Sequence, residues 1–156
     1  MHTEPSDNQP TSTLENAVPT WLETQFEQLH DQARMLVDDY WRQLQSRHKQ
    51  VASNERGRIG IRIRRRESSL SFSIEWYRMA SLRQNGQTKP ICQYLKKGLG
   101  YRYPLQNILK GEPDWEQTLV EELENEFVDI RKQLALLGKI RDAYHQFQQA
   151  RQEGNR

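Results

Sequence analysis

The segment that decides the fold runs from Arg56 to Trp76 and reads RGRIGIRIRRRESSLSFSIEW. In its first half, isoleucine occupies every second position from Ile59 to Ile63. The alternate positions carry cations at Arg58, Arg62, Arg64 and Arg66. A repeat of two residues predicts a β-strand with one apolar and one cationic face, because successive side chains of a strand point to opposite sides.

A second strand is predicted directly after the first. Its apolar positions alternate with polar ones and comprise Leu70, Phe72, Ile74 and Trp76. The short gap favours a tight antiparallel hairpin with Glu67 and Ser68 as the turn. The predicted register pairs Ile63 with Phe72, Ile61 with Ile74, Ile59 with Trp76, Arg64 with Ser71 and Arg62 with Ser73. A slip of one residue would set arginines against the core, so we expect a row of guanidinium groups on the outer surface.

A third antiparallel strand is predicted beyond Asn85-Gly86, because both residues tolerate the positive φ angles of a two-residue type I′ turn. Pairing around this turn sets Leu95 opposite Trp76, Tyr94 opposite Tyr77 and Lys96 opposite Glu75. Pro90 fits only an edge strand, since proline has no N–H to donate. Arg78 falls on the apolar phase and is the exception to the pattern. The expected sheet is a three-stranded meander.

Amphipathic helices are predicted on both sides of the sheet. The first begins at Thr20, where Thr20 and Glu23 resemble a capping box, and ends near Val51 to Asn54. Its apolar stripe is Leu22, Phe26, Leu29, Ala33, Leu36 and Tyr40, with Leu44 out of phase. A short helix is expected over Pro104 to Lys110. A last helix of roughly 38 residues opens at Pro113, and its stripe is Trp115, Leu119, Leu123, Phe127, Ile130, Leu134, Leu137, Tyr144 and Phe147.

The predicted fold class is therefore α+β: a long N-terminal helix, a three-stranded antiparallel β-meander, a short helix, and a long C-terminal helix packed on the first. Residues 1–19 are acidic and aperiodic, which is typical of a disordered arm. Residues 20–152 are expected to form a single domain, and residues 153–156 a tail. The apolar surface that the two long helices leave over is available for a homodimer.

Composition excludes several classes of protein. The chain has 156 residues, of which 35% are hydrophobic and 28% charged, and a single cysteine, which rules out an internal disulfide. There is no apolar run that could span a bilayer and no secretory signal, so we expect a cytoplasmic protein without membrane contact. The net charge of +2 hides a cationic centre: residues 55–102 hold twelve Lys or Arg and three acids, or +9, which leaves −7 for the rest.

No catalytic or metal-binding pattern is present. The histidines, at positions 2, 30, 48 and 145, do not have metal-ligand spacing. No phosphate-binding loop or nucleophile elbow occurs. The acidic run Glu121, Glu122, Glu124 and Glu126 is interpreted as a solvated helix face. The sequence thus predicts neither an enzyme nor a cofactor or metal site.

The cationic strand face is the candidate functional site. Arginine binds phosphate with two parallel hydrogen bonds, and nearby tyrosines offer planes for stacking, which favours a nucleic-acid surface. The candidate nucleic-acid-binding residues are Arg58, Arg62, Arg64, Arg66, Tyr94, Lys96, Lys97 and Arg102. Two other interpretations remain open: a scaffold whose cationic sheet docks an acidic protein partner, and an ordinary solvated sheet face.

Several segments resemble one protein family. These are SIEWYR at Ser73–Arg78, YLKKGLGYRYP at Tyr94–Pro104, Trp115, EELE at Glu121–Glu124, and Tyr40-Trp41 in the first helix. Together they resemble the MobI family of auxiliary mobilisation proteins of bacterial integrative conjugative elements and conjugative plasmids, over about Trp21 to Gln149. The resemblance implies a non-enzymatic protein of the relaxosome that binds double-stranded DNA at the origin of transfer and helps bring the relaxase to it.

Overall fold

The computed structural model describes residues 16–155. The predicted disordered N-terminal segment, residues 1–19, therefore lies mostly outside the described residues, as does Arg156 of the predicted tail. Along the chain the elements are α2 (Ala17–His48), the 3-10 turn η1 (Ser53–Glu55), β1 (Ile59–Arg64), β2 (Ser73–Gln84), β3 (Gln87–Tyr94), α3 (Leu105–Ile108) and α4 (Asp114–Gly154). The α+β order of elements that the periodicity predicted is confirmed.

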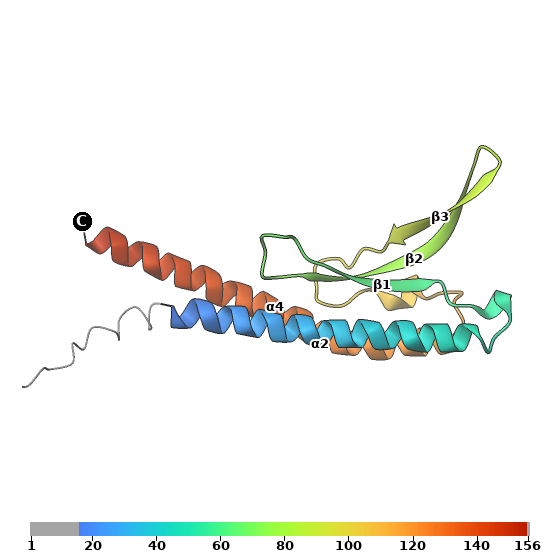
Figure 1. Cartoon of the computed structure of the whole chain (residues 1–156), viewed down its shortest axis with the longest axis horizontal. Helices are drawn as coiled ribbons and strands as arrows, with labels where there is room; N and C mark the ends of the chain where they lie inside the picture. Colours follow the sequence, from blue (N-terminus) through green and yellow to red (C-terminus); the bar gives the residue numbers. More distant parts are fainter. Residues whose placement is uncertain (1–15, 156) are drawn as a thin grey trace, which may run out of the picture.

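The two long helices pack antiparallel and form the base of the molecule (Figure 1). The end of α2 meets the start of α4, where the rings of His48 and Trp115 stack edge to face at 6.0 Å. Near the other end of α2, the Arg141 guanidinium lies over the Phe26 ring at 5.8 Å. A helix of 41 residues such as α4 needs a packing partner along its length, and α2 provides it.

Three details of α2 differ from the sequence prediction. The helix begins at Ala17 after Asn16 with no side-chain cap, so Thr20 is an interior residue and the predicted capping box is absent. The helix ends at His48, before the predicted Val51. Val37 and Leu44 are buried, whereas Leu36 is only half-buried. A straight helix drifts relative to a strict seven-residue repeat, so the buried stripe moves onto neighbouring positions.

The sheet has the strand order β1-β2-β3. Its apolar face packs against both long helices. Trp76 is fully buried between Tyr40 of α2, at 5.4 Å, and Phe127 of α4, at 6.0 Å. The Tyr40 hydroxyl also donates to the Ile59 carbonyl at 2.6 Å, and the Trp41 indole donates to the Ile61 carbonyl at 3.3 Å. Both helices therefore hold the β1–β2 half of the sheet in place.

The predicted register of the first hairpin is wrong by two residues. Ile61 pairs with Trp76, Ile63 with Ile74 and Arg64 with Ser73, so the connection spans residues 65–72 and is not a two-residue turn at Glu67-Ser68. A shift of two leaves every side chain on its predicted face, so the alternation could not distinguish the two registers. Arg65 fixes the longer loop, because its guanidinium contacts Glu27 of α2 and the carbonyls of Ser69 and Leu70.

The second hairpin has the predicted geometry. Asn85 and Gly86 have φ angles of 53° and 76°, as a type I′ turn requires. Tyr77 pairs with Tyr94, and the Leu95 N–H donates to the Trp76 carbonyl at 3.0 Å. β3 ends at Tyr94, so the predicted pair between Lys96 and Glu75 is not part of the ladder. β3 is an edge strand, as Pro90 indicated.

The β2–β3 hairpin extends beyond the helices. Its outer part, residues 81–91, is exposed on both strands and rises away from the helical base (Figure 1). We call these residues the arm. Among residues 16–155, no helix combines the length and hydrophobicity needed to cross a bilayer.

Candidate nucleic-acid interface

The outer face of the sheet is built around Arg62 and two tyrosines. The Arg62 guanidinium forms an ion pair with Glu75 of β2 at 2.8 Å and lies over the Tyr94 ring at 3.8 Å. The Tyr94 ring in turn contacts Tyr77 at 5.6 Å between centroids. Partial burial opposes the charge of Arg62, but the Glu75 carboxylate more than offsets this and raises the pKa of the guanidinium. Arg62 is therefore held in place as a paired cation.

Gly60 leaves room for the Tyr77 ring in this group. Its role was not predicted from the sequence. It stands on the cationic phase of β1 and pairs with Tyr77. A Cβ atom at Gly60 would lie 2.3 Å from the Tyr77 ring, so only glycine lets the ring lie flat across β1. The signal in the sequence was a glycine within a strand, which often marks the close approach of another group.

Arg64 and Arg66 form a separate group at the end of β1. Both are exposed, and within residues 16–155 neither side chain forms an ion pair. Together with Ser69, Ser71 and Ser73 they line an open hollow of about 380 Å³, which Phe72 and Glu75 complete. We call Arg64, Arg66 and these three serines the rim. The two guanidinium groups and the hydroxyls of Ser69 and Ser71 form a donor set suited to an anion such as a phosphate group, whereas the Ser73 hydroxyl donates to the Arg64 carbonyl at 3.5 Å.

Arg58 has a different environment from the other predicted arginines. It lies just before β1 and contacts the buried Glu112 carboxylate at 3.0 Å. Arg78, the exception on the apolar phase, reaches the same carboxylate at 3.6 Å and donates to the Ile108 carbonyl. The Glu112 carboxylate thus explains how Arg78 is accommodated on the apolar face of the sheet, and it partly neutralises the charge of Arg58.

Glu116 completes this acidic pair beneath β1. Its side chain is fully buried, and one carboxylate oxygen accepts from the Ile59 N–H at 3.2 Å. Burial, followed by the neighbouring charge of Glu112, raises the pKa of Glu116 to about 8. A Cβ atom at Gly57 would lie 1.7 Å from the other carboxylate oxygen, so Gly57 leaves the space that Glu116 occupies.

The remaining predicted residues do not join the rim. Tyr94 is 46% exposed beside Arg62, whereas Lys96 follows β3 as an exposed residue. Lys97 folds back and donates to the carbonyls of Gly98 and Gly100. Arg102 lines another hollow of about 450 Å³ near α3, together with Glu121 and Asn125. The eight predicted residues therefore fall into several groups and do not form one continuous row.

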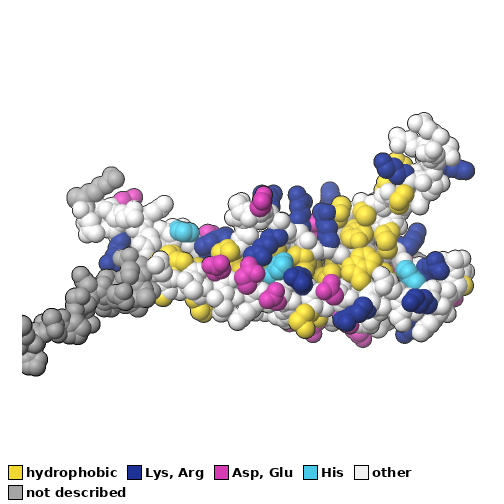
Figure 2. Space-filling view, viewed as in Figure 1, with side chains coloured by type: hydrophobic (Ala, Val, Ile, Leu, Met, Phe, Trp, Pro, Cys, Tyr) yellow, Lys and Arg dark blue, Asp and Glu magenta, His cyan; other side chains and the backbone are white. Residues whose placement is uncertain are grey.

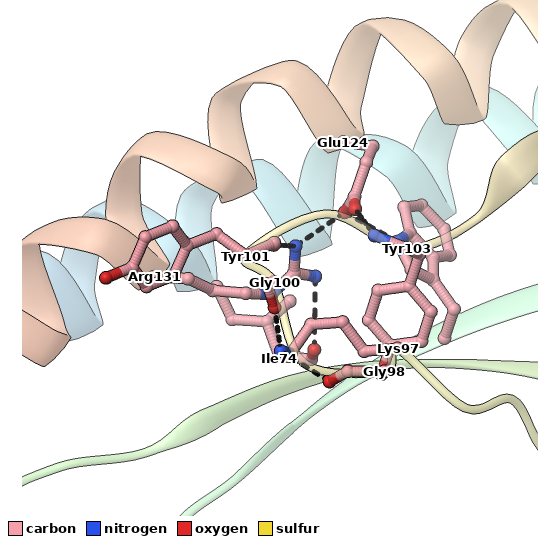
Figure 3. A network of polar contacts seen from close by, with 9 residues as sticks. Ile74, Lys97, Gly98, Gly100, Tyr101, Tyr103, Glu124 and Arg131 are labelled. Atoms are coloured by element: carbon pink, nitrogen blue, oxygen red, sulfur yellow. Dashed lines mark hydrogen bonds and ion pairs between the residues drawn. The ribbon is translucent and has the colours of Figure 1, made fainter.

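The loop that carries Lys97 and Arg102 is fixed by a buried ion pair (Figure 3). Glu124 and Arg131 of α4 are 2.8 Å apart and almost fully buried. Glu124 also accepts from the Trp76 indole at 3.1 Å and from the Tyr103 N–H at 2.7 Å. Arg131 donates to the carbonyls of Tyr101, at 2.8 Å, and Ile74, at 3.2 Å. The prediction that Glu124 is part of a solvated helix face is wrong, because its side chain is fully buried and bonded to these partners.

Lys and Arg side chains stand above the helical base in the region of the sheet and on the arm, and others lie over the helices (Figure 2). Among residues 16–155, no cluster of His, Cys, Asp and Glu side chains has a geometry that could hold a metal ion. The described surface therefore offers cations, hydroxyl groups and tyrosine rings for binding.

Comparison with known proteins identifies one family. The sequence model of the MobI family, described as MobI protein, matches residues 29–145, which is most of the chain. No curated protein and no solved structure gives a significant match. The matched segment runs from the middle of α2 through the sheet into the C-terminal half of α4.

Proposed function

The chain belongs to the MobI family, which implies a role in mobilisation, and we propose that it binds double-stranded DNA at the origin of transfer through the outer face of its sheet. In this proposal the protein has no catalytic activity of its own. It acts in the bacterial cytoplasm as a single α+β DNA-binding domain and helps to bring the relaxase to the DNA.

The observation that carries the proposal is the rim. Its two arginines have no ion-pair partner among residues 16–155, whereas Arg58 and Arg62 are paired with Glu112 and Glu75. Side chains without an internal partner keep their donors for an external anion. Ser69 and Ser71 of the rim add hydroxyl donors around the same hollow. We therefore assign phosphate contact mainly to Arg64 and Arg66, with Lys96 and Arg102 as outlying contacts.

The helical base is the surface we propose for protein partners. Leu136 and Ile140 of α4 are 47% and 42% exposed, and they line a hollow of about 270 Å³ between the long helices. Phe147, farther along α4, is 58% exposed. These apolar side chains lie on the helical layer and leave the sheet free, so the relaxase or a second copy of the chain can bind there while DNA occupies the sheet.

A binding assay tests the proposal. The protein is titrated against duplex fragments from the transfer origin of its own element and against scrambled duplexes of the same composition. Each phosphate contact that is lost should reduce the salt dependence by about one unit of slope, so Arg64→Ala/Arg66→Ala should lose about two units between about 50 and 200 mM salt. Lys132→Ala, which removes an exposed cation of α4, is the matched control and should leave the slope unchanged.

The result that overturns the proposal is also defined. If the double variant keeps its thermal midpoint, its affinity for DNA and its salt slope, the rim is not the DNA site. Failure of the wild-type protein to bind any duplex, together with salt-sensitive capture of an acidic protein by the same face, would favour the scaffold interpretation.

A further inference from the structure

The arm, residues 81–91, has no evident structural role in the body of the protein, by which we mean the helices and the part of the sheet that packs on them. Every arm residue is exposed, and β3 pairs only with β2. The buried core instead contains β2 residues only as far as Trp76. An isolated two-stranded hairpin is marginally stable in water, so an arm that contributes no residue to the buried core needs another explanation for its length.

The side chains of the arm are of the kinds that recognise bases. No Asp or Glu occurs between Trp76 and Gly111, so the arm lies within a wholly non-acidic segment. The arm itself carries Arg83, Gln84, Asn85, Gln87, Thr88 and Lys89 around its turn. Arginine and lysine donate to guanine, and glutamine and asparagine form paired hydrogen bonds with adenine, through the edges that the major groove displays. Leu82 and Ile91 are exposed at 44% and 37% and could contact thymine methyl groups.

The dimensions of the arm match the groove. Its paired residues, Ser81–Gln84 and Gln87–Pro90, form two strands of four residues. At about 3.4 Å per residue the arm is about 14 Å long, which exceeds the roughly 8.5 Å depth of the major groove. The major groove is about 12 Å wide and admits a two-stranded ribbon. Arg83 and Thr88 pair on the same face as Tyr77 and Tyr94, whereas Gln84 and Gln87 pair on the opposite face.

The arm and the rim stand at opposite ends of β2. Arg64 of the rim pairs with Ser73 at the start of β2, and the arm contains Gln84 at its end. Eleven residue steps of extended strand span at most about 37 Å, close to the 34–36 Å of one turn of B-DNA. One duplex lying along the outer face can therefore contact both ends of the strand.

We infer that the arm enters the major groove and contacts base edges, while the rim holds phosphates about one helical turn away. This inference rests on the proposed DNA binding and adds to it the element that supplies sequence discrimination. The arm is then a specificity element, and the rim contributes affinity that does not depend on sequence.

The test compares discrimination with affinity. Arg83→Ala and Gln84→Ala/Gln87→Ala are each titrated against the transfer-origin duplex that binds best and against its scrambled counterpart. Loss of a base contact lowers the ratio of the two affinities by about 5- to 150-fold, whereas loss of a phosphate contact lowers both affinities together. The control Lys132→Ala should leave the ratio unchanged, and Arg64→Ala/Arg66→Ala should weaken both affinities alike.

A modified duplex locates the contact in the groove. Replacing guanine by 7-deazaguanine removes the N7 acceptor from the major groove. The modification should lower the affinity of the wild-type protein for the duplex. If Arg83 makes that contact, the modification should lower the affinity of Arg83→Ala by a smaller factor, as a double-mutant cycle requires.

The failures of the two proposals can be told apart. If the wild-type protein binds both duplexes equally, or if the arm variants keep its discrimination and its sensitivity to 7-deazaguanine, the arm is not a base reader, although DNA binding stands. Unchanged DNA binding with lost retention of the relaxase would make the arm a protein-docking element and overturn the inference. If no duplex is bound, both proposals fail.

Discussion

The two halves of β2 lie in opposite environments. From Ile74 to Arg78 the strand packs on the helical base, and both of its charges are paired: Glu75 with Arg62, and Arg78 with Glu112. From Ser81 onward the same strand is exposed, and residues 81–91 contain no acid that could pair with Arg83 or Lys89. In the packed half, these ion pairs help to fix the structure. The cations of the arm have no partner within the arm itself.

This difference separates structural from functional cations in a chain whose net charge is only +2. A buried arginine with several acceptors, such as Arg131, is costly to remove because its partner then remains charged in a dry environment. An exposed arginine on a ribbon contributes little to folding. Removing a buried, paired arginine should therefore lower the free energy of unfolding, whereas removing an exposed arginine of the arm should change DNA binding and leave stability almost unchanged.

The largest effect is expected for Arg131→Met. This change leaves the Glu124 carboxylate buried without its cation and also frees the carbonyls of Tyr101 and Ile74. Breaking a buried pair in this way should lower the free energy of unfolding by about 3–5 kcal/mol. Urea denaturation followed by circular dichroism measures the change.

Arg83→Met is the matched change in the arm and should stay within about 0.5 kcal/mol of the wild-type protein. The distinction between body and arm would be wrong if both variants lost the same stability, or if Arg131→Met lost less than about 1 kcal/mol.

Much of the body could be predicted from local patterns. The isoleucine alternation at Ile59, Ile61 and Ile63 identified β1 and its buried face, and Asn85-Gly86 fixed the second hairpin with its correct register. Both signals act over a few residues, where backbone geometry and side-chain direction are tightly linked. The resemblance to the MobI family is likewise confirmed.

What could not be predicted depends on contacts between distant segments. Glu124 looked like a surface residue because its partners, Trp76 and Arg131, are 48 and 7 residues away. The first hairpin was misaligned because a shift of two residues preserves both faces, and the longer loop is held by contacts of Arg65 that include the distant Glu27 of α2. The division of the arginines into paired and unpaired groups follows from Glu75, which pairs with Arg62, and from Glu112, which pairs with Arg58 and Arg78 and whose burial no local pattern indicated.

The buried acidic pair of the body should make stability depend on pH. The pKa of Glu116 is raised to about 8, above its ordinary value of 4.5, so the folded protein binds a proton more tightly than the unfolded chain. The stability that this proton contributes is fully present below about pH 4.5 and is lost as the pH rises to about 8. We therefore expect the free energy of unfolding to fall between about pH 5 and pH 8, as the buried carboxyl loses its proton.

Glu116→Gln should flatten this dependence, because the amide stays neutral throughout. Glu122→Gln, on the exposed face of α4, should keep the wild-type slope and serves as the control. Free energies of unfolding from urea titrations at several pH values provide the measurement. A slope that survives in Glu116→Gln would assign the proton to another group.

The smallest effect is expected when the arm is removed. Ala80 pairs with Ile91 in the same hydrogen-bonding phase as Gln84 with Gln87, so residues 81–90 can be replaced by Asn-Gly to close the same ladder with a two-residue turn. The removed side chains are exposed and contribute nothing to the buried core, so the free energy of unfolding should stay within about 0.5 kcal/mol of the wild-type value. Hydrogen exchange should show the same contrast, with fast exchange at Arg83 and Thr88 and slow exchange at Ile61 and Trp76. A loss of stability comparable to that of Arg131→Met would mean that the arm belongs to the cooperative core, and the contrast between the two halves of β2 would then no longer hold.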